Sequence, residues 1–128
     1  MDNALADRLA DVDRRIADAA RDAHREPTDI TRIVVTKFHP VELIRDLHDL
    51  GVRDFGENRQ QELSAKRAEI GQLDGATWHF IGQAQTNKAR AVRADADVVH
   101  SVDRARLADA LDAGADGIPL TVLLQINL

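Results

Sequence analysis

The chain has 128 residues, 44% of them hydrophobic, a size that can bury one core but not two. Its 22 acidic and 17 basic residues give a net charge of -5, and the basic residues are scattered, which excludes the concentrated positive surface that nucleic acid requires. The chain has no cysteine, no signal-peptide pattern and no apolar run approaching the roughly 18 residues of a membrane span. We therefore expect one cytoplasmic domain, residues 1–128, that binds neither nucleic acid nor membrane.

The order of apolar and turn-forming residues predicts alternating helices and strands. Apolar residues recur every three or four positions from Leu5 to Ile16, which predicts an amphipathic helix ending near Arg25, before Pro27. The β-branched run Ile33–Thr36 predicts a strand covered on both faces. The other expected elements are a helix from Pro40 closed by Gly51, strand 52–55, helix 58–73, strand 78–81, helix 86–94, strand 98–101, a helix from Asp103 ended by Gly114 or Gly117, and strand 121–126.

This alternation favours a parallel sheet joined by right-handed crossovers. A doubly wound five-strand sheet would be complete at this length, whereas a (β/α)8 barrel needs about 250 residues. The segment "TKFHP" after the first strand lacks the glycine-rich loop of dinucleotide-binding folds, and the chain stops on an apolar strand. We therefore expect an α/β fold that is a partial (β/α)8 TIM-type barrel, with about five parallel strands after an N-terminal helix.

Polar side chains follow the predicted strands, at the rim where such barrels hold their ligands. Lys37 follows the first strand, Asn58 the second and Asn127 the fifth. A lysine at the mouth of an apolar site is poorly solvated, which makes its neutral amine available to condense with an aldehyde or ketone. That carbonyl could belong to a sugar-like substrate or to pyridoxal phosphate.

These residues also have simpler structural explanations. Lys37 could be a solvated surface lysine, and Asn58 could cap the third helix. His79 stands between Trp78 and Phe80 on a strand, where a hydrogen-bonded core histidine is common. The histidines show no metal-binding spacing and the serines no nucleophile-elbow context, so we expect neither a metal site nor a hydrolase.

Five segments, in this order and at this spacing, resemble the pyridoxal phosphate homeostasis proteins, single-domain relatives of the barrel of alanine racemase: "VVTKFHP", "FGENRQQE", "WHFIGQAQTNK", "VHSVDR" and "LLQIN". The resemblance extends from about Ala4 to Leu128. It implies a barrel that holds pyridoxal 5′-phosphate as an aldimine on Lys37, with Asn58 and His79 near the cofactor, and we add Asn127 as a further cofactor-binding residue. Members of the family carry or buffer this aldehyde for pyridoxal-dependent apoenzymes, without established catalysis.

The chain departs from the family pattern in two ways. Thr36 and Arg59 stand where serine and tyrosine are more usual. The family's Ser/Gly-rich phosphate-binding segment would lie beyond Leu128, so we expect the N-terminal half, or slightly more, of a barrel that is truncated at its carboxyl end. The open edges of the first and fifth strands could then pair with a second copy.

Three functions follow in order of preference. The first is a pyridoxal phosphate carrier. The second is a pyridoxal- or Schiff-base-dependent enzyme such as a racemase, aldolase or lyase, although the chain has no tyrosine to serve as the second acid/base of a racemase. The third is a cofactor-free half-barrel that acts as an interaction fragment.

Overall fold

The computed structural model describes residues 3–114 and 117–128, in which helices and strands alternate as predicted. The strands are β1 (Val34–Val35), β2 (Asp54–Glu57), β3 (Thr77–Phe80), β4 (Val98–Val102) and β5 (Thr121–Leu124). The helices are α1 (Asn3–Asp22), α2 (Val41–Asp49), α3 (Gln60–Ile70), α4 (Ala89–Asp95) and α5 (Ala105–Ala113), with short 3-10 turns η1 (Pro27–Asp29) and η2 (Thr86–Lys88).

All neighbouring strands pair in parallel, and their order in the sheet is their order in the chain, β1-β2-β3-β4-β5. A doubly wound sheet reverses its strand order at a switch point, so that alternative is wrong. Sequential order with a helix after each strand is the arrangement of the first units of a (β/α)8 barrel. The predicted partial barrel is confirmed.

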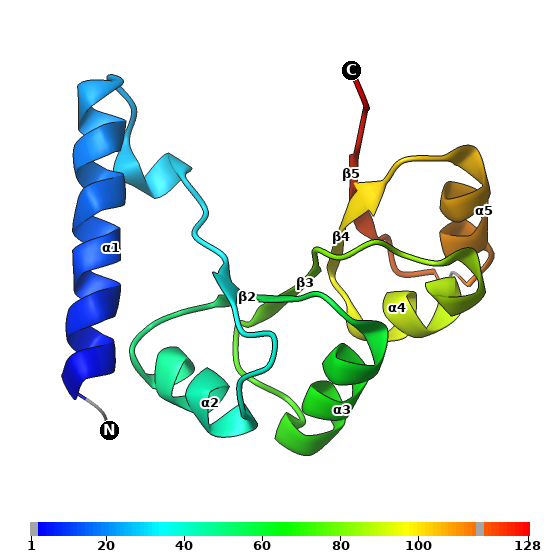
Figure 1. Ribbon diagram of the computed structural model, residues 1–128, viewed down its shortest axis with the longest axis horizontal. Helices are drawn as coiled ribbons and strands as arrows, with labels where there is room; N and C mark the ends of the chain where they lie inside the picture. Colours follow the sequence, from blue (N-terminus) through cyan, green and yellow to red (C-terminus); the bar gives the residue numbers. More distant parts are fainter. Residues whose placement is uncertain (1–2, 115–116) are drawn as a thin grey trace.

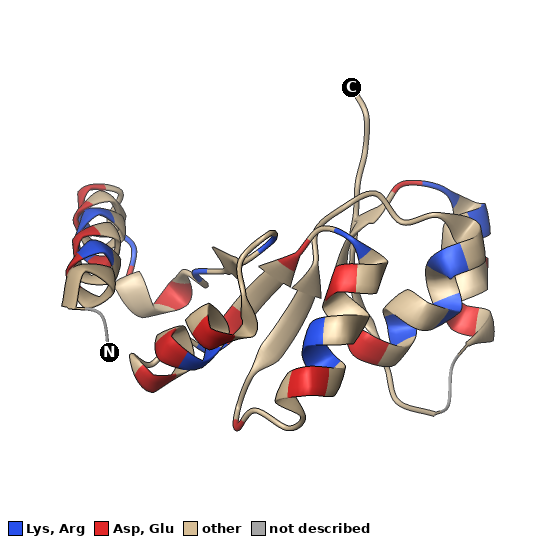
Figure 2. Ribbon diagram, turned by 60° about the horizontal axis from the view of Figure 1, so that its bottom comes forward, with Lys and Arg blue, Asp and Glu red and all other residues tan. Residues whose placement is uncertain are grey.

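The hydrophobic core lies on one side of the sheet, where α2 to α5 follow one another along its convex face (Figure 1). Phe55 and Trp78, neighbours on β2 and β3, stack at 5.5 Å between ring centroids. Each helix contributes fully or nearly buried side chains to this layer, for example Ile44, Leu63 and Leu107. Lys, Arg, Asp and Glu alternate on the outer surfaces of the helices (Figure 2).

Among residues 3–114 and 117–128, no helix covers the other face of the sheet (Figure 1). Val35 is 43% exposed, and every residue of β5 is exposed. The prediction that Ile33–Thr36 is a strand covered on both faces is therefore wrong: the strand is shorter, Val34–Val35, and only the helix side is covered. In a closed barrel this inner face is filled by side chains of strands across the axis, and five strands do not close.

Two other differences from the predicted elements have local causes. β2 begins at Asp54 and not at Val52, because the Val52 N–H is used by the end of α2, where it donates to the Leu47 carbonyl at 2.9 Å. Asn58 does not cap α3, since Arg59 occupies the cap position and no side chain bonds the free N–H groups there. Gly51 closes α2 with a φ of +101°, as expected.

Helix α1 stands beside the β1 end of the sheet (Figure 1). Its Leu5 and Leu9 pack partly against the core, and Asp13 pairs with Arg32, which leads into β1. Ala20 is buried, and its carbonyl accepts from the Arg25 N–H at 2.8 Å where the helix ends. Among the described residues no helix is both long enough and apolar enough to cross a bilayer.

The position of the core predicts that two phenylalanines contribute very differently to the free energy of unfolding. Phe55→Ala should lower the free energy of unfolding by about 3–5 kcal/mol, because it leaves a cavity beside Trp78. Phe38→Ala should cost less than about 1 kcal/mol, because this ring is 70% exposed and has only an Arg59 guanidinium over it. Urea unfolding of both variants measures the difference, and equal losses would contradict the described core.

Candidate functional site

Lys37 lies in the turn that follows β1, at the carboxyl rim of the sheet. The turn closes with a hydrogen bond from the His39 N–H to the Thr36 carbonyl at 3.1 Å, and Phe38 has a φ of +68°. Lys37 is exposed. Residues 3–114 and 117–128 therefore do not shield this lysine from water, contrary to the expectation from the sequence. Within those residues its ammonium makes no hydrogen bond or ion pair. The amine is therefore accessible from solvent.

A buried polar cluster lies beneath this turn, on the helix side of the sheet. Glu57, at the end of β2, is fully buried; its carboxylate accepts from the Thr36 hydroxyl and lies 3.0 Å from Lys66 Nζ. Lys66 on α3 also donates to the Thr36 carbonyl at 2.7 Å and lies 3.2 Å from Glu62 Oε2. The same Glu62 oxygen accepts from the Phe38 N–H at 2.7 Å. We call Glu57, Glu62 and Lys66 the under-turn cluster.

These contacts favour the ionised form of the Glu62 carboxyl group. Burial of this carboxyl group disfavours ionisation, but the hydrogen bond from Phe38 and the adjacent Lys66 ammonium outweigh that cost. Together they hold the pKa of Glu62 below its ordinary value. These contacts therefore favour the carboxylate form of Glu62.

Asn58 follows β2, next to the Lys37 turn along the rim, and is half-buried. The loop after β3 passes directly over it: a Cβ atom built on Gly82 would lie 2.0 Å from the Asn58 carbonyl oxygen. Only glycine permits this approach. The Asn58 backbone is thereby held between β2 and the loop that follows β3.

His79 lies on the uncovered face, in register with Gly56 of β2, and is only 6% exposed. Its Nε2 lies 2.9 Å from Asp54 Oδ1 and its Nδ1 lies 2.9 Å from His100 Nε2. A carboxylate accepts only, so neutral His79 donates from Nε2 and accepts at Nδ1 from the Nε2–H of His100. Both nitrogens are thus occupied, and the simpler explanation of His79 as a hydrogen-bonded histidine is the one that the contacts support.

His100 and Asp54 are site residues that the sequence reasoning missed. Each directly neighbours a buried strand residue, Val99 or Phe55, and therefore lies on the uncovered face. This alternation along the strands is the sequence pattern that could have identified them. Partial burial, and then the nearby His79, lower the pKa of His100. The row Asp54, His79 and His100 therefore crosses three strands as a hydrogen-bonded chain in which His100 favours the neutral form.

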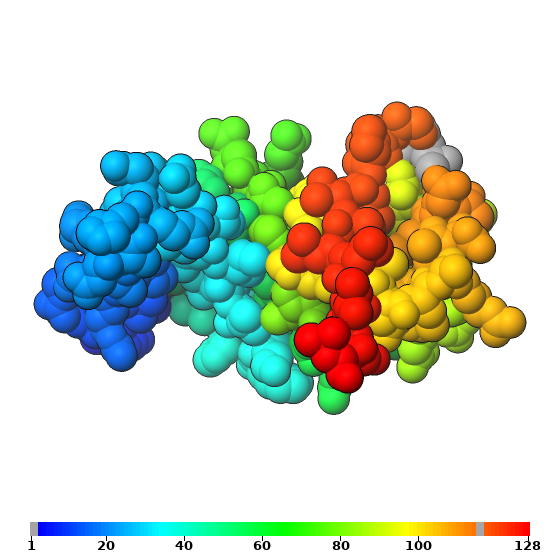
Figure 3. Space-filling model, turned by 90° about the horizontal axis from the view of Figure 1, so that it is seen from above, coloured from blue at the N-terminus to red at the C-terminus, as the bar shows by residue number. Residues whose placement is uncertain are grey.

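Asn127 does not join these residues. It lies in the exposed segment after β5, which projects from the sheet (Figure 1) and comes forward when the molecule is seen from above (Figure 3). The strand order puts β2, β3 and β4 between β5 and the Lys37 turn. The structure thus brings Lys37 and Asn58 to one part of the rim, places His79 on the neighbouring inner face and leaves Asn127 apart.

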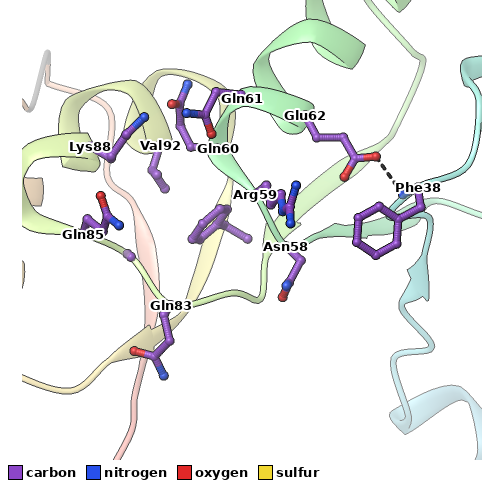
Figure 4. Close-up of a pocket in the computed structure, with 12 residues that line it drawn as sticks. Phe38, Asn58, Arg59, Gln60, Gln61, Glu62, Gln83, Gln85, Lys88 and Val92 are labelled. Atoms are coloured by element: carbon purple, nitrogen blue, oxygen red, sulfur yellow. Dashed lines mark hydrogen bonds between the residues drawn. The ribbon is translucent and has the colours of Figure 1, made fainter.

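A cleft of about 650 Å³ lies beside the rim, between the start of α3 and the η2–α4 segment (Figure 4). Of the predicted site residues it includes only Asn58, and neither Lys37 nor His79 lines it. In the close-up, Phe38 and Glu62 lie at one end and Lys88 at the other. No cluster able to hold a metal ion occurs among the residues that the structure describes.

Comparison with known proteins gives relatives that cover nearly the whole chain. A pyridoxal phosphate homeostasis protein of Pseudomonas aeruginosa is 41% identical over 126 residues, which are 97% of this chain and 54% of that protein. A protein of the same name from Corynebacterium glutamicum is 45% identical over 98 residues, 76% of this chain and 43% of that protein. The chain spans about half the length of the curated relatives it matches. No family model matches it.

Solved structures agree with these relatives. PipY of Synechococcus elongatus without PLP matches with a TM-score of 0.81 at 39% identity, over 96% of this chain and 54% of that chain. PipY with PLP bound matches with a TM-score of 0.73 at 41% identity, over 88% of this chain and 55% of that chain. The described strands and helices therefore correspond to about half of a structure that has been solved with PLP.

The histidine row predicts acid sensitivity. Because the pKa of His100 is lowered on folding, the unfolded chain binds its proton more readily, and stability should fall as pH drops below the ordinary value of 6.5. His100→Gln should flatten this fall in the free energy of unfolding, measured by urea unfolding from pH 8 to pH 5. The exposed His39 gives the control, since His39→Gln should leave the slope unchanged. Equal slopes in all three proteins would contradict the assignment.

The close approach of Gly82 to Asn58 predicts that Gly82 does not tolerate a larger side chain. Gly82→Ala should destabilise the chain by about 1–3 kcal/mol, because the added methyl group meets the Asn58 backbone. Gly114→Ala is the matched control: there the nearest atom to the new Cβ is 3.5 Å away and φ is -85°, so the change should be within about 0.5 kcal/mol. Thermal unfolding of the two variants checks this, and a neutral Gly82→Ala would show that the loop can move away.

Proposed function

We propose that this chain, which belongs to the pyridoxal phosphate homeostasis protein family, supplies the amine side of a site that holds pyridoxal 5′-phosphate without turning over a substrate. The cofactor contributes a reactive aldehyde. Lys37 would hold the cofactor through Nζ, the atom that can condense with an aldehyde. Carrying the cofactor in this way protects the cell from a free aldehyde and keeps it available to other enzymes.

Support for Lys37 comes from the surroundings of the three lysines in the chain. Lys66 is buried and held by Glu57 and Glu62, so its amine is not accessible. Lys88 lines the cleft between α3 and α4, on the helix side of the rim. Lys37 combines an accessible amine with a position at the carboxyl rim, beside Asn58, and this combination is the observation that carries the proposal.

The other predicted residues take more limited roles in this proposal. Asn58 offers a half-buried amide next to the Lys37 turn, suited to bind a polar substituent of the cofactor. His79 keeps the inner face polar through Asp54 and His100, and Asn127, in the exposed segment after β5, would reach the cofactor only from outside the Lys37 region. The phosphate would require groups beyond those described, since the chain spans about half of its relatives.

We further propose a cytoplasmic protein that passes the cofactor to pyridoxal-dependent apoenzymes. The absence of cysteine and the excess of acidic residues support a reducing compartment and a highly soluble carrier. The exposed apolar residues of β5, together with the open edges of β1 and β5, also support self-association of this chain through its sheet.

The test is visible absorbance of the purified chain after addition of pyridoxal 5′-phosphate, followed by borohydride reduction and peptide mapping. We expect a stoichiometric yellow species that maps to Lys37. It should disappear in Lys37→Ala and persist in Lys88→Ala, the matched control at a second accessible lysine.

Three results would overturn or redirect the proposal. Labelling spread equally over Lys37, Lys88 and the terminal amine would reject a specific site. No labelling, combined with self-association in analytical ultracentrifugation, would favour the cofactor-free interaction fragment. Measurable turnover of an amino or keto acid by the loaded protein would favour the pyridoxal-dependent enzyme.

A further inference from the structure

The residues on both sides of Lys37 are held by the same buried charges. On the N-terminal side, the hydroxyl group of fully buried Thr36 donates a hydrogen bond to Glu57, and the Thr36 carbonyl accepts one from Lys66 at 2.7 Å. On the C-terminal side, the Phe38 N–H donates to Glu62 at 2.7 Å. Lys37 itself makes no such contact among the described residues. Its backbone is thus restrained while its side chain is left free.

Lys66 is the centre of this arrangement. Its Nζ lies 3.0 Å from Glu57 Oε2 and 3.2 Å from Glu62 Oε2, so one amino group bridges the two carboxylates that hold the turn. Glu62 and Lys66 are four residues apart on α3, which sets them on one face of that helix. A rigid helix thereby connects to both flanks of Lys37.

Stability alone is a weak reason for such a cluster. Buried ion pairs lose solvation that their mutual attraction only partly restores, and apolar side chains of the same volume commonly serve as well. Charged groups add geometric specificity, because each of their hydrogen bonds fixes the position of its partner. Here the specified partners are the Thr36 carbonyl and, through Glu62, the N–H of Phe38 in its left-handed conformation.

We propose that Lys66 is a positioning residue for Lys37: by joining Glu57 and Glu62 it holds Thr36 and Phe38, so that the turn presents the Lys37 amine at the rim in one orientation. The inference rests on the proposed function of Lys37. It assigns to the buried lysine of α3 a role in how fast and how selectively an aldehyde reacts at the exposed lysine. Lys66 acts through the backbone and does not touch the cofactor.

The decisive variant is Lys66→Met combined with Glu57→Gln, which removes both members of the most deeply buried pair; Glu62 keeps the Phe38 N–H but loses its lysine partner. Lys88 remains as an internal reference amine in every protein. The readout is the ratio of Lys37 to Lys88 labelling by pyridoxal 5′-phosphate and borohydride, measured on protein whose circular dichroism matches the parent. We expect this ratio to fall about tenfold, because a loosened turn presents the amine in many orientations.

A milder pair of variants keeps the test available if the double variant does not fold. Glu62→Ala removes the acceptor of the Phe38 N–H on a partly exposed side chain, whereas Glu69→Ala removes an exposed carboxylate from the same helix. The Lys37 to Lys88 ratio should fall in Glu62→Ala and stay at the parent value in Glu69→Ala. An unchanged ratio in folded Glu62→Ala and in the folded double variant would overturn the inference.

Hydrogen exchange separates failure of this inference from failure of the proposed function. The Phe38 amide should exchange more than about tenfold faster in the double variant than in the parent, with or without cofactor, since its acceptor is no longer held. If the parent shows no preference for Lys37, the proposed function fails, but faster exchange at Phe38 would still support the restraint of the turn. Unchanged exchange would reject that restraint whatever the labelling shows.

Discussion

Each of the strands β1 to β4 is followed by a helix that returns along the same face of the sheet, and this constraint decides where chemistry can take place. Right-handed crossovers between adjacent parallel strands bring α2 to α5 to one side and the carboxyl ends of all strands to one rim. Lys37 and Asn58 are neighbours for this reason, although residues 38–57, which include α2 and β2, separate them in the chain. The face without helices keeps its apolar side chains exposed and carries the row of Asp54, His79 and His100.

The two faces use polar groups differently. On the helix side, Glu57 and Lys66 form an almost inaccessible ion pair 3.0 Å long, which joins β2 to α3 at one defined point. On the uncovered side the His100 imidazole favours the neutral form, because partial burial and the nearby His79 lower its pKa. The turn that carries Lys37 lies at the boundary between these two environments, supported from below by charge and open above to solvent.

Local patterns were sufficient for part of the site. Lys37 and Asn58 follow apolar strands directly, and strand ends can be read from β-branched runs and turn residues, so their place on the rim was predictable. Lys66 was not found, because at this position of a polar helix a buried lysine looks the same in sequence as a solvated one. His79 was placed near the cofactor, yet its partners come from two other strands, and register between strands determines such pairs.

The sequence by itself determined the alternation of strands and helices, the approximate bounds of each element and the candidate lysine, because apolar periodicity and turn chemistry act over a few residues. Only the tertiary structure decided the sequential strand order, the exposure of Val35 and β5, and the contacts of Thr36 and Phe38 with the under-turn cluster. Those features depend on which distant residues become neighbours. Burial and hydrogen bonding are set by that packing, and no local pattern specifies it.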